Sequence, residues 1–215
     1  PLGVTFSFLI AAPMVNEIAL GLLYGMFGWK IALLYIVSGE VIAIVGGIVI
    51  GKMGMEKFVE SYVYEMQNMS NTEVVRLCIK IRVTDAWIFT KDLIKRIWIY
   101  VFIGIAIGGV IHGWIPAGTL AQYAGRDNPF AVPIAVLLGI PLYSNAAGVI
   151  PLVSELTRAG VSMGTALSFM MAVTALSFPE AILLKQVLKP QLLAFFFCLV
   201  GSGIIFVGYL FNYLL

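Results

Sequence analysis

The chain has 215 residues, of which 61% are hydrophobic and 11% charged, and its mean hydropathy is +1.02. A soluble globule of this size needs more polar surface, so the composition indicates an integral membrane protein. The formal net charge of +2 and the absence of a basic cluster suited to nucleic acid exclude a nucleic-acid-binding protein.

Residues 3–24 form the first apolar segment, which has the length of about 20 residues that an α-helix needs to cross hydrocarbon. Pro13 lies in its middle, and Asn16 and Glu17 follow one turn later. Proline removes a backbone donor from a helix. Irregular backbone at membrane depth is tolerated only where protein or a water-filled cavity satisfies the freed groups. The sequence therefore predicts a broken helix with polar groups at the break.

Residues 29–50 form a second apolar segment, and Gly28 and Lys30 mark a tight turn before it. We expect residues 1–51 to form a helical hairpin that is the C-terminal part of a first repeat. Glu40 lies deep in this second segment. Protonation removes the burial penalty of an intramembrane carboxylate, so Glu40 is a candidate for proton coupling.

Residues 52–96 are more polar than the apolar segments on either side. Eight of the thirteen Lys and Arg residues lie between positions 51 and 96. The positive-inside rule predicts a cytoplasmic loop here. Phe58, Tyr62 and Met66 recur at a spacing of four, which is typical of an amphipathic helix on the bilayer surface.

Residues 97–215 are predicted to be the second repeat, beginning with a transmembrane helix at 97–114. Residues 129–157 then form two apolar stretches that are each too short to cross the membrane. If this segment crosses, the two repeats run the same way; if it re-enters, they are inverted. The re-entrant arrangement places ten Lys and Arg residues on the cytoplasmic side and three on the outer side. The crossing arrangement places nine on the cytoplasmic side and four on the outer side. The count favours the inverted, re-entrant arrangement and leaves the other open.

Residues 161–184 and 192–214 repeat the first two segments. Gly3 corresponds to Gly164, a shift of 164 − 3 = 161, and Ser7 corresponds to Ser168 at the same shift. A duplicated apolar unit is typical of secondary transporters, whose substrate site lies between the repeats. No equivalent of residues 128–158 precedes Leu2, so we expect the native beginning to lie outside this sequence.

The fold expected is thus an all-α polytopic membrane protein with two repeats and broken or re-entrant helices at mid-membrane. Unpaired polar groups are costly in hydrocarbon, so those at the breaks should converge on the bundle interior. The alternatives are plain kinks for the prolines, interhelical hydrogen bonds for the asparagines and an interfacial position for Glu180. The candidate residues for substrate binding and translocation are Pro13, Asn16, Glu17, Pro141, Tyr143, Ser144, Asn145, Thr174, Ser177 and Glu180.

The remaining polar and aromatic residues are assigned structural roles. Tyr35, with other aromatic residues near segment ends, is interpreted as an anchor at the membrane interface, and so is His112. Cys78 and Cys198 are far apart and have no metal-ligand spacing. We therefore expect no metal site and no cofactor.

Residues 6–16, 139–148 and 164–172, which include the Ala-Pro-Met-Val-Asn and Pro-Leu-Tyr motifs, resemble the predicted-permease family that includes the organoarsenical efflux permeases. The resemblance covers nearly the whole chain outside residues 53–71. It implies a permease of the prokaryotic cytoplasmic (inner) membrane that exports a small solute or a metal or metalloid species. Arsenical-handling members carry cysteines near these breaks, where this chain has Ser144 and Asn145. A thiophilic cargo needs thiolates, so arsenic or copper is not expected unless residues outside this sequence supply them.

A secondary transporter is therefore the leading function, with the lipid bilayer and a small-molecule or ion substrate as partners and a homo-oligomer as an open alternative. One rival is a non-transporting membrane subunit that anchors a soluble partner through residues 52–96. The other is an intramembrane enzyme, which would need a cluster of Arg, Glu and Ser or His. The apolar segments contain no Arg, so we predict that the protein is not an enzyme.

Overall fold

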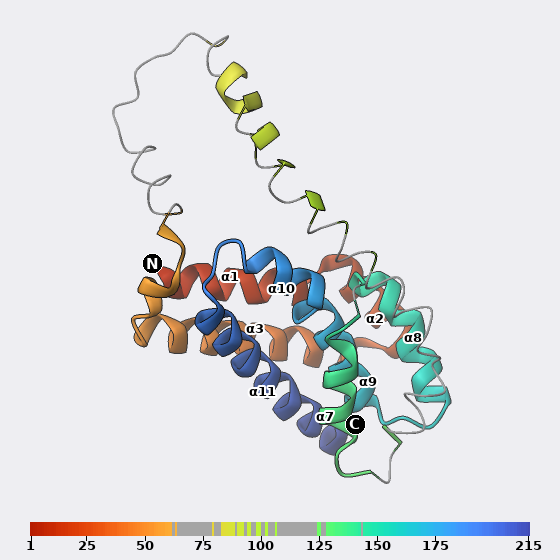
Figure 1. Ribbon diagram of the computed structural model, residues 1–215. Coiled ribbons are helices and arrows are strands. Elements are labelled where there is room, and N and C mark those ends of the chain that lie inside the picture. Colours follow the sequence, from red (N-terminus) through yellow and green to blue (C-terminus); the bar gives the residue numbers. More distant parts are fainter. Residues whose placement is uncertain are drawn as a thin grey trace.

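The computed structural model of the chain describes residues 1–61, 128–142 and 144–215, together with positions 63, 79, 83–88, 90–92, 94, 95, 98, 99, 102, 106, 124 and 125. The elements of the continuous stretches are helices (Figure 1). In chain order they are α1 (Leu2–Met14), α2 (Glu17–Phe27), α3 (Trp29–Lys52), the 3-10 helix η1 (Met55–Phe58), α7 (Ala131–Gly139), α8 (Ala146–Arg158), α9 (Met163–Ala175), α10 (Phe178–Leu184) and α11 (Pro190–Leu214).

Three helical stretches in the described part of the chain are long and apolar enough to cross a membrane: Trp29–Lys52, Met163–Leu184 and Pro190–Leu214. Helices α1 and α2 together pass the same test as a fourth, bent by 43°. At about 1.5 Å per residue, the 24 residues of α3 exceed the hydrocarbon thickness of about 30 Å. For the described residues, the expectation of an all-helical protein is confirmed, and three or four of its helical stretches have the length and composition that a membrane span requires.

Small residues bring α1 close to α3. A Cβ on Gly3 would lie 2.7 Å from the carbonyl oxygen of Gly47, and the Ser7 hydroxyl occupies the space beside Gly47. Helices in lipid gain no hydrophobic driving force from one another, so close approach through small residues is a main source of their association.

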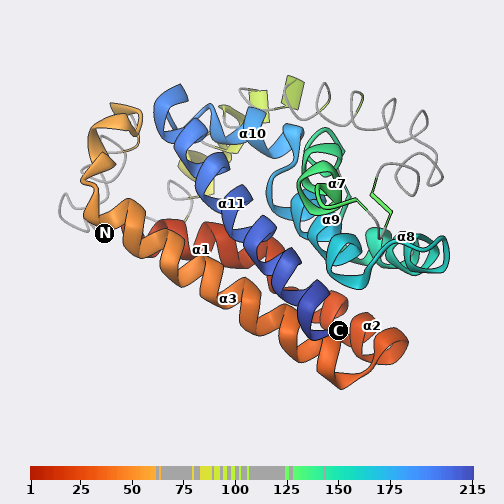
Figure 2. The ribbon, with the colours of Figure 1, turned by 90° about the horizontal axis from the view of Figure 1, so that it is seen from below.

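Helix α9 lies at the centre of the bundle, between α11 and α8 (Figure 2). It contacts α7, α8, α11 and α1, and eleven of its thirteen residues are buried. Its closest approach to α11 again uses glycines, because the backbone of Gly164 lies against Gly208 and the Ser168 hydroxyl fills the space beside Gly208. A helix that is apolar on all sides is buried in protein or in lipid, and α9 is enclosed by protein.

Helices α3 and α11 run in opposite directions. The backbone N–H of Lys189 donates to the carbonyl oxygen of Phe58 at 2.8 Å, and Val59 pairs with Leu188. These contacts place the end of α3 beside the start of α11, and the two helices then cross near their middles (Figure 1). Their outer faces carry exposed apolar side chains, among them Ile44 and Phe206, as expected for surfaces that meet lipid.

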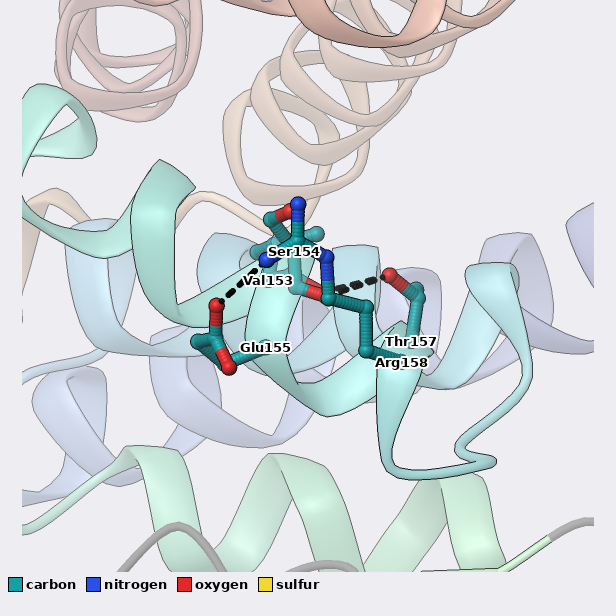
Figure 3. A network of polar contacts seen from close by, with 5 residues as sticks. All are labelled: Val153, Ser154, Glu155, Thr157 and Arg158. Carbon is teal, nitrogen blue, oxygen red and sulfur yellow. Dashed lines mark hydrogen bonds and ion pairs between the residues drawn. The ribbon is translucent and has the colours of Figure 1, made fainter.

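Helices α7 and α8 form a hairpin whose two ends lie at the same end of the bundle. Gly125, before α7, pairs with Val161, after α8. The Tyr209 hydroxyl, near the end of α11, donates to the carbonyl oxygen of Pro129 at 2.6 Å. The last turn of α8 is polar and exposed: the Arg158 guanidinium pairs with the Glu155 carboxylate at 3.1 Å (Figure 3).

Several predicted features fall outside the described residues. They include most of the predicted cytoplasmic loop at 52–96, with Tyr62 and Met66, and most of the predicted helix at 97–114, with His112. The boundaries drawn at residues 51, 96 and 97 stay predictions.

Candidate functional site

The first helix break lies between α1 and α2, at the predicted place one turn after Pro13. The side-chain oxygen of Asn16 accepts hydrogen bonds from the backbone N–H groups of Ile18, at 2.8 Å, and Ala19, at 3.2 Å. Asn16 is therefore the N-cap of α2, since it satisfies two donors that a helix start leaves unpaired.

The second break lies between α9 and α10, where Leu176 and Ser177 leave the helical conformation. Thr174 is in the last turn of α9, and its hydroxyl donates to the carbonyl oxygens of Met170 and Met171 at 3.0 and 3.1 Å. Glu180 is in the first turn of α10 and is half-buried.

The third interruption is the tip of the α7–α8 hairpin. Pro141 and Ser144 lie there, both half-buried, and Tyr143 lies outside the described residues. The side-chain oxygen of Asn145 accepts a hydrogen bond from the backbone N–H of Gly148 at 2.8 Å, so Asn145 caps α8 as Asn16 caps α2. Gly139 permits the tip to approach α9, because a Cβ there would lie 2.9 Å from the Ala172 Cβ.

The hairpin tip and the second break are joined directly. The backbone N–H of Phe178, which starts α10, donates to the carbonyl oxygen of Ile140 at 2.7 Å. The predicted residues Pro141, Thr174 and Ser177 thus lie in neighbouring interruptions of two different segments. Backbone groups freed by one interruption are satisfied by the other, as burial in protein requires.

The first break approaches the second through α3. A Cβ on Gly39 of α3 would lie 3.5 Å from both the Met14 Cβ and the Val15 Cγ2, at the end of α1. One turn earlier on α3, the Tyr35 hydroxyl lies beside the Thr174 side chain of α9. The two breaks therefore flank the same stretch of α3.

Tyr35 is a residue of this region that the sequence interpretation misplaced. The prediction of an interface anchor is wrong, because Tyr35 is 1% exposed and belongs to the core. A signal was present in the sequence: Tyr35, Gly39, Ile42 and Gly46 recur at helical spacing, and all four face the protein interior. That stripe, which includes two glycines, could have assigned Tyr35 to the packed face of α3.

The two predicted asparagines and the predicted acids lie in different surroundings. Helices α2 and α8 contact each other, but Asn16 and Asn145 each hold the start of their own helix. Glu17 and Glu40 are exposed, and Glu17 borders a groove of about 480 Å³ with Tyr24 and Trp29. Of the three acids, Glu180 is the one that the bundle partly encloses.

A groove of about 480 Å³ also lies between α3 and α11, but its lining is apolar apart from Ser38 and Ser202. It opens beside exposed side chains such as Val41 and Phe206, so it belongs to the outer apolar surface.

The described residues contain no group of three or more His, Cys, Asp or Glu side chains that could hold a metal ion. The candidate site is therefore the junction of the hairpin tip, the α9–α10 break and Tyr35, which we call the break junction.

The described helices are long and apolar enough to span a bilayer, and a hydrogen bond joins two of their interruptions, which is the architecture of an integral membrane protein. The chain belongs to the predicted-permease family, which matches residues 1–213, and the resemblance noted in the sequence is confirmed. Permease membership points to a transporter rather than an enzyme.

The chain is also similar to a UPF0718 protein of Methanocaldococcus jannaschii, with 30% identity over 96 residues. The aligned region is 45% of this chain and 26% of that relative, so the chain matches about a quarter of the relative's length. No solved structure matches the chain.

Proposed function

We propose that the protein is a secondary transporter that exports a small solute, or a metal or metalloid species, across the prokaryotic cytoplasmic membrane, and that the break junction is its substrate site. The observation that carries the proposal is the 2.7 Å hydrogen bond from the Phe178 N–H to the Ile140 carbonyl oxygen. It joins two interrupted segments of the bundle, and transporters hold substrates and coupling ions at interrupted helices.

The positions of the helices support a duplicated architecture. Helices α1, α2 and α3 begin at Leu2, Glu17 and Trp29, whereas α9, α10 and α11 begin at Met163, Phe178 and Pro190, so each pair of starts differs by 161. The packing follows the same interval, because the contacts of Gly3 and Ser7 with Gly47 recur as contacts of Gly164 and Ser168 with Gly208.

The opposite directions of α3 and α11 support an inverted relation between the two halves. Because these helices are counterparts in the proposed repeat, two parallel copies would give them the same direction. The pairing of Val59 with Leu188 instead joins the end of α3 to the start of α11. The same contact brings Lys57 to Lys189, whose ammonium group donates to the Lys57 carbonyl oxygen at 3.0 Å. Positive side chains gathered at one end favour the cytoplasmic side for that end.

The α7–α8 hairpin supports the re-entrant interpretation of residues 129–157. Its two ends meet through the pairing of Gly125 with Val161, and its tip meets the α9–α10 break. A crossing segment would separate its ends by the thickness of the hydrocarbon core, about 30 Å.

The test is solute flux by the full-length protein in proteoliposomes and in everted vesicles, after growth of a deletion strain has been compared across metals, metalloids and thiols. Gly139→Val is the informative variant, because a larger side chain would push the hairpin tip away from Ala172 and Phe169. We expect it to abolish flux at normal membrane abundance. Leu137→Ala is the matched control, since Leu137 is on the same helix and 65% exposed.

Three results would count against the proposal: a deletion strain indistinguishable from wild type on every solute, equal flux by Gly139→Val and wild type, and flux only in the inward direction. The alternative of a non-transporting subunit predicts that cutting residues 52–96 removes partner binding and that no solute flux exists to be lost.

A further inference from the structure

Two buried side-chain polar atoms in the described part of the chain have no hydrogen-bond partner, and both lie at the break junction. They are the Tyr35 hydroxyl and the Ser177 hydroxyl, and each residue is 1% exposed. Native proteins pair nearly all of their buried polar atoms, so each exception needs a physical explanation.

The other buried hydroxyl groups of this bundle follow the general rule. Ser38 donates to the Tyr35 carbonyl oxygen at 2.9 Å, and Ser168 donates to the Gly164 carbonyl oxygen at 2.8 Å. Thr165 shares a hydrogen bond with Ser162 at 2.8 Å. Among the described residues, the unpaired hydroxyls are therefore those of Ser177, in the α9–α10 break, and of Tyr35, which lies on α3 beside Thr174.

The two unpaired hydroxyls come from different parts of the chain, α3 and the segment between α9 and α10. Tyr35 projects from α3 toward Thr174, and Ser177 follows Thr174 by three residues, just beyond the end of α9. The Thr174 side chain is the neighbour of the Tyr35 hydroxyl, but the geometry between the two hydroxyl groups is not that of a hydrogen bond. The hydrogen of the Thr174 hydroxyl is directed to the carbonyl oxygens of Met170 and Met171 in its own helix.

We propose that the Tyr35 and Ser177 hydroxyls bind the transported solute directly, and that this solute is an uncharged molecule that both donates and accepts hydrogen bonds. The inference rests on the proposed transport function and narrows its substrate class. A hydroxyl group can donate one hydrogen bond and accept others, so a pair of hydroxyls complements hydroxyl or amide groups of a solute.

The surroundings disfavour a free ion or a thiophilic cargo. The two hydroxyl groups carry no charge, so they complement a neutral solute, whereas a buried ion needs a partner of opposite charge. The carboxylate nearest in sequence to Ser177 is Glu180, half-buried on α10, and a cation that pairs with it is the alternative that the cation probes below test. Soft metals need thiolates, whereas Cys198, the cysteine in the described part of the chain, is exposed on α11. A solute without net charge requires neither a partner of opposite charge nor a thiolate.

The experiment measures flux by the full-length protein in proteoliposomes with six probes. Glycerol, urea and boric acid represent uncharged hydrogen-bonding solutes, and Zn²⁺, Cd²⁺ and Cu⁺ represent cations. We expect protein-dependent flux of at least one uncharged probe and a loss of about tenfold in Tyr35→Phe and in Ser177→Ala, because each variant leaves a solute group unpaired. Tyr24→Phe is the matched control, since Tyr24 is exposed, and it should retain wild-type flux.

Thermal unfolding of the same variants separates binding from folding. Tyr35→Phe removes a buried hydroxyl that has no partner, so its melting temperature should equal or exceed that of wild type while its flux falls. A lower melting temperature would show that the hydroxyl has a partner in the folded protein and would overturn the inference.

The remaining outcomes distinguish this inference from the proposed function. Cation flux without flux of any uncharged probe, or uncharged flux that both variants leave unchanged, would overturn the inference and leave transport standing. No flux of any of the six probes would count against both.

Discussion

Ile42 of α3 and Gly203 of α11 contact each other where the two helices cross, and their positions differ by 203 − 42 = 161. A Cβ on Gly203 would lie 3.3 Å from the Ile42 Cγ1. The interval is the one that separates the starts of α1 and α9. A residue that touches its own counterpart lies on the axis relating two copies, so under the proposed repeat this crossing is the symmetry centre of the two halves.

The crossing can be tested by a disulfide between Ile42→Cys and Gly203→Cys, in a background where Cys78 and Cys198 are serine. A disulfide needs Cβ atoms about 3.5 to 4.5 Å apart. A Cβ on Gly203 would contact the side chain of Ile42 at 3.3 Å, so the two positions are neighbours. We expect rapid oxidation in membranes, detected as a crosslink between fragments after cleavage in the loop.

Ile44→Cys with Gly203→Cys is the control, because Ile44 is 52% exposed on the outer face of α3. Equal oxidation of both pairs, or none in the first pair, would contradict the crossing.

The glycine contacts of the two halves predict a matched pair of unstable variants. Gly47→Ala and Gly208→Ala would each place a methyl group against a serine, Ser7 in the first case and Ser168 in the second. Overpacking of this kind costs about 1–3 kcal/mol. Both variants should therefore lower the unfolding temperature of the full-length protein in detergent.

Gly25→Ala serves as the comparison, since nothing lies within 4 Å of a Cβ at that position of α2. Alanine is favoured over glycine in a helix by up to about 1 kcal/mol, so this variant should match or exceed wild type. If all three variants melted alike, the close packing of α1 on α3 and of α9 on α11 would be refuted.

Local features of the chain were predictable from the sequence. Pro13 marked a helix break because its missing N–H acts within one turn, and α2 begins at Glu17 as that interpretation requires. The apolar segments predicted the long apolar helices, because the hydrocarbon thickness sets the length that a transmembrane helix needs. The interval of 161 between matching residues could be found because the comparison uses only residue identities. The repeat itself stays a prediction.

Long-range relationships were less accessible. Tyr35 is buried in the core and lies beside Thr174, which is more than 120 positions later, so the residue alone could not separate a core tyrosine from an interface tyrosine. The asparagines were assigned to a shared polar pocket, yet each caps a helix. An asparagine directly before a helix start is a local capping signal, and it could have been applied to Asn16 and Asn145.

The caps give a third prediction. Asn16→Ala and Asn145→Ala should each destabilise the protein by about 1 kcal/mol, because the backbone donors at the starts of α2 and α8 lose their acceptor. Asn→Ser and Asn→Asp at either position should recover most of the unfolding temperature, since both residues can cap. Recovery of stability with no recovery of flux would show that the amide also binds solute, contrary to a purely capping role.

The hairpin of α7 and α8 leads to a prediction about membrane sidedness. Lys57 and Lys189 lie together at one end of the bundle. Arg158 lies at the other end, because α8 ends beside the start of α9, and Val161 pairs there with Gly125. A re-entrant hairpin therefore places Arg158 on the same side as Lys30, at the start of α3, whereas a crossing segment places it with Lys57.

Single cysteines at these four positions, in the cysteine-free background, can be labelled in intact cells by a membrane-impermeant maleimide. We expect labelling of Lys30→Cys and Arg158→Cys from outside, and labelling of Lys57→Cys and Lys189→Cys only after the cells are opened. A cytoplasmic Arg158→Cys would show that residues 129–157 cross the bilayer. The two halves would then run in the same direction, and the inverted arrangement proposed from the opposed directions of α3 and α11 would have to be abandoned.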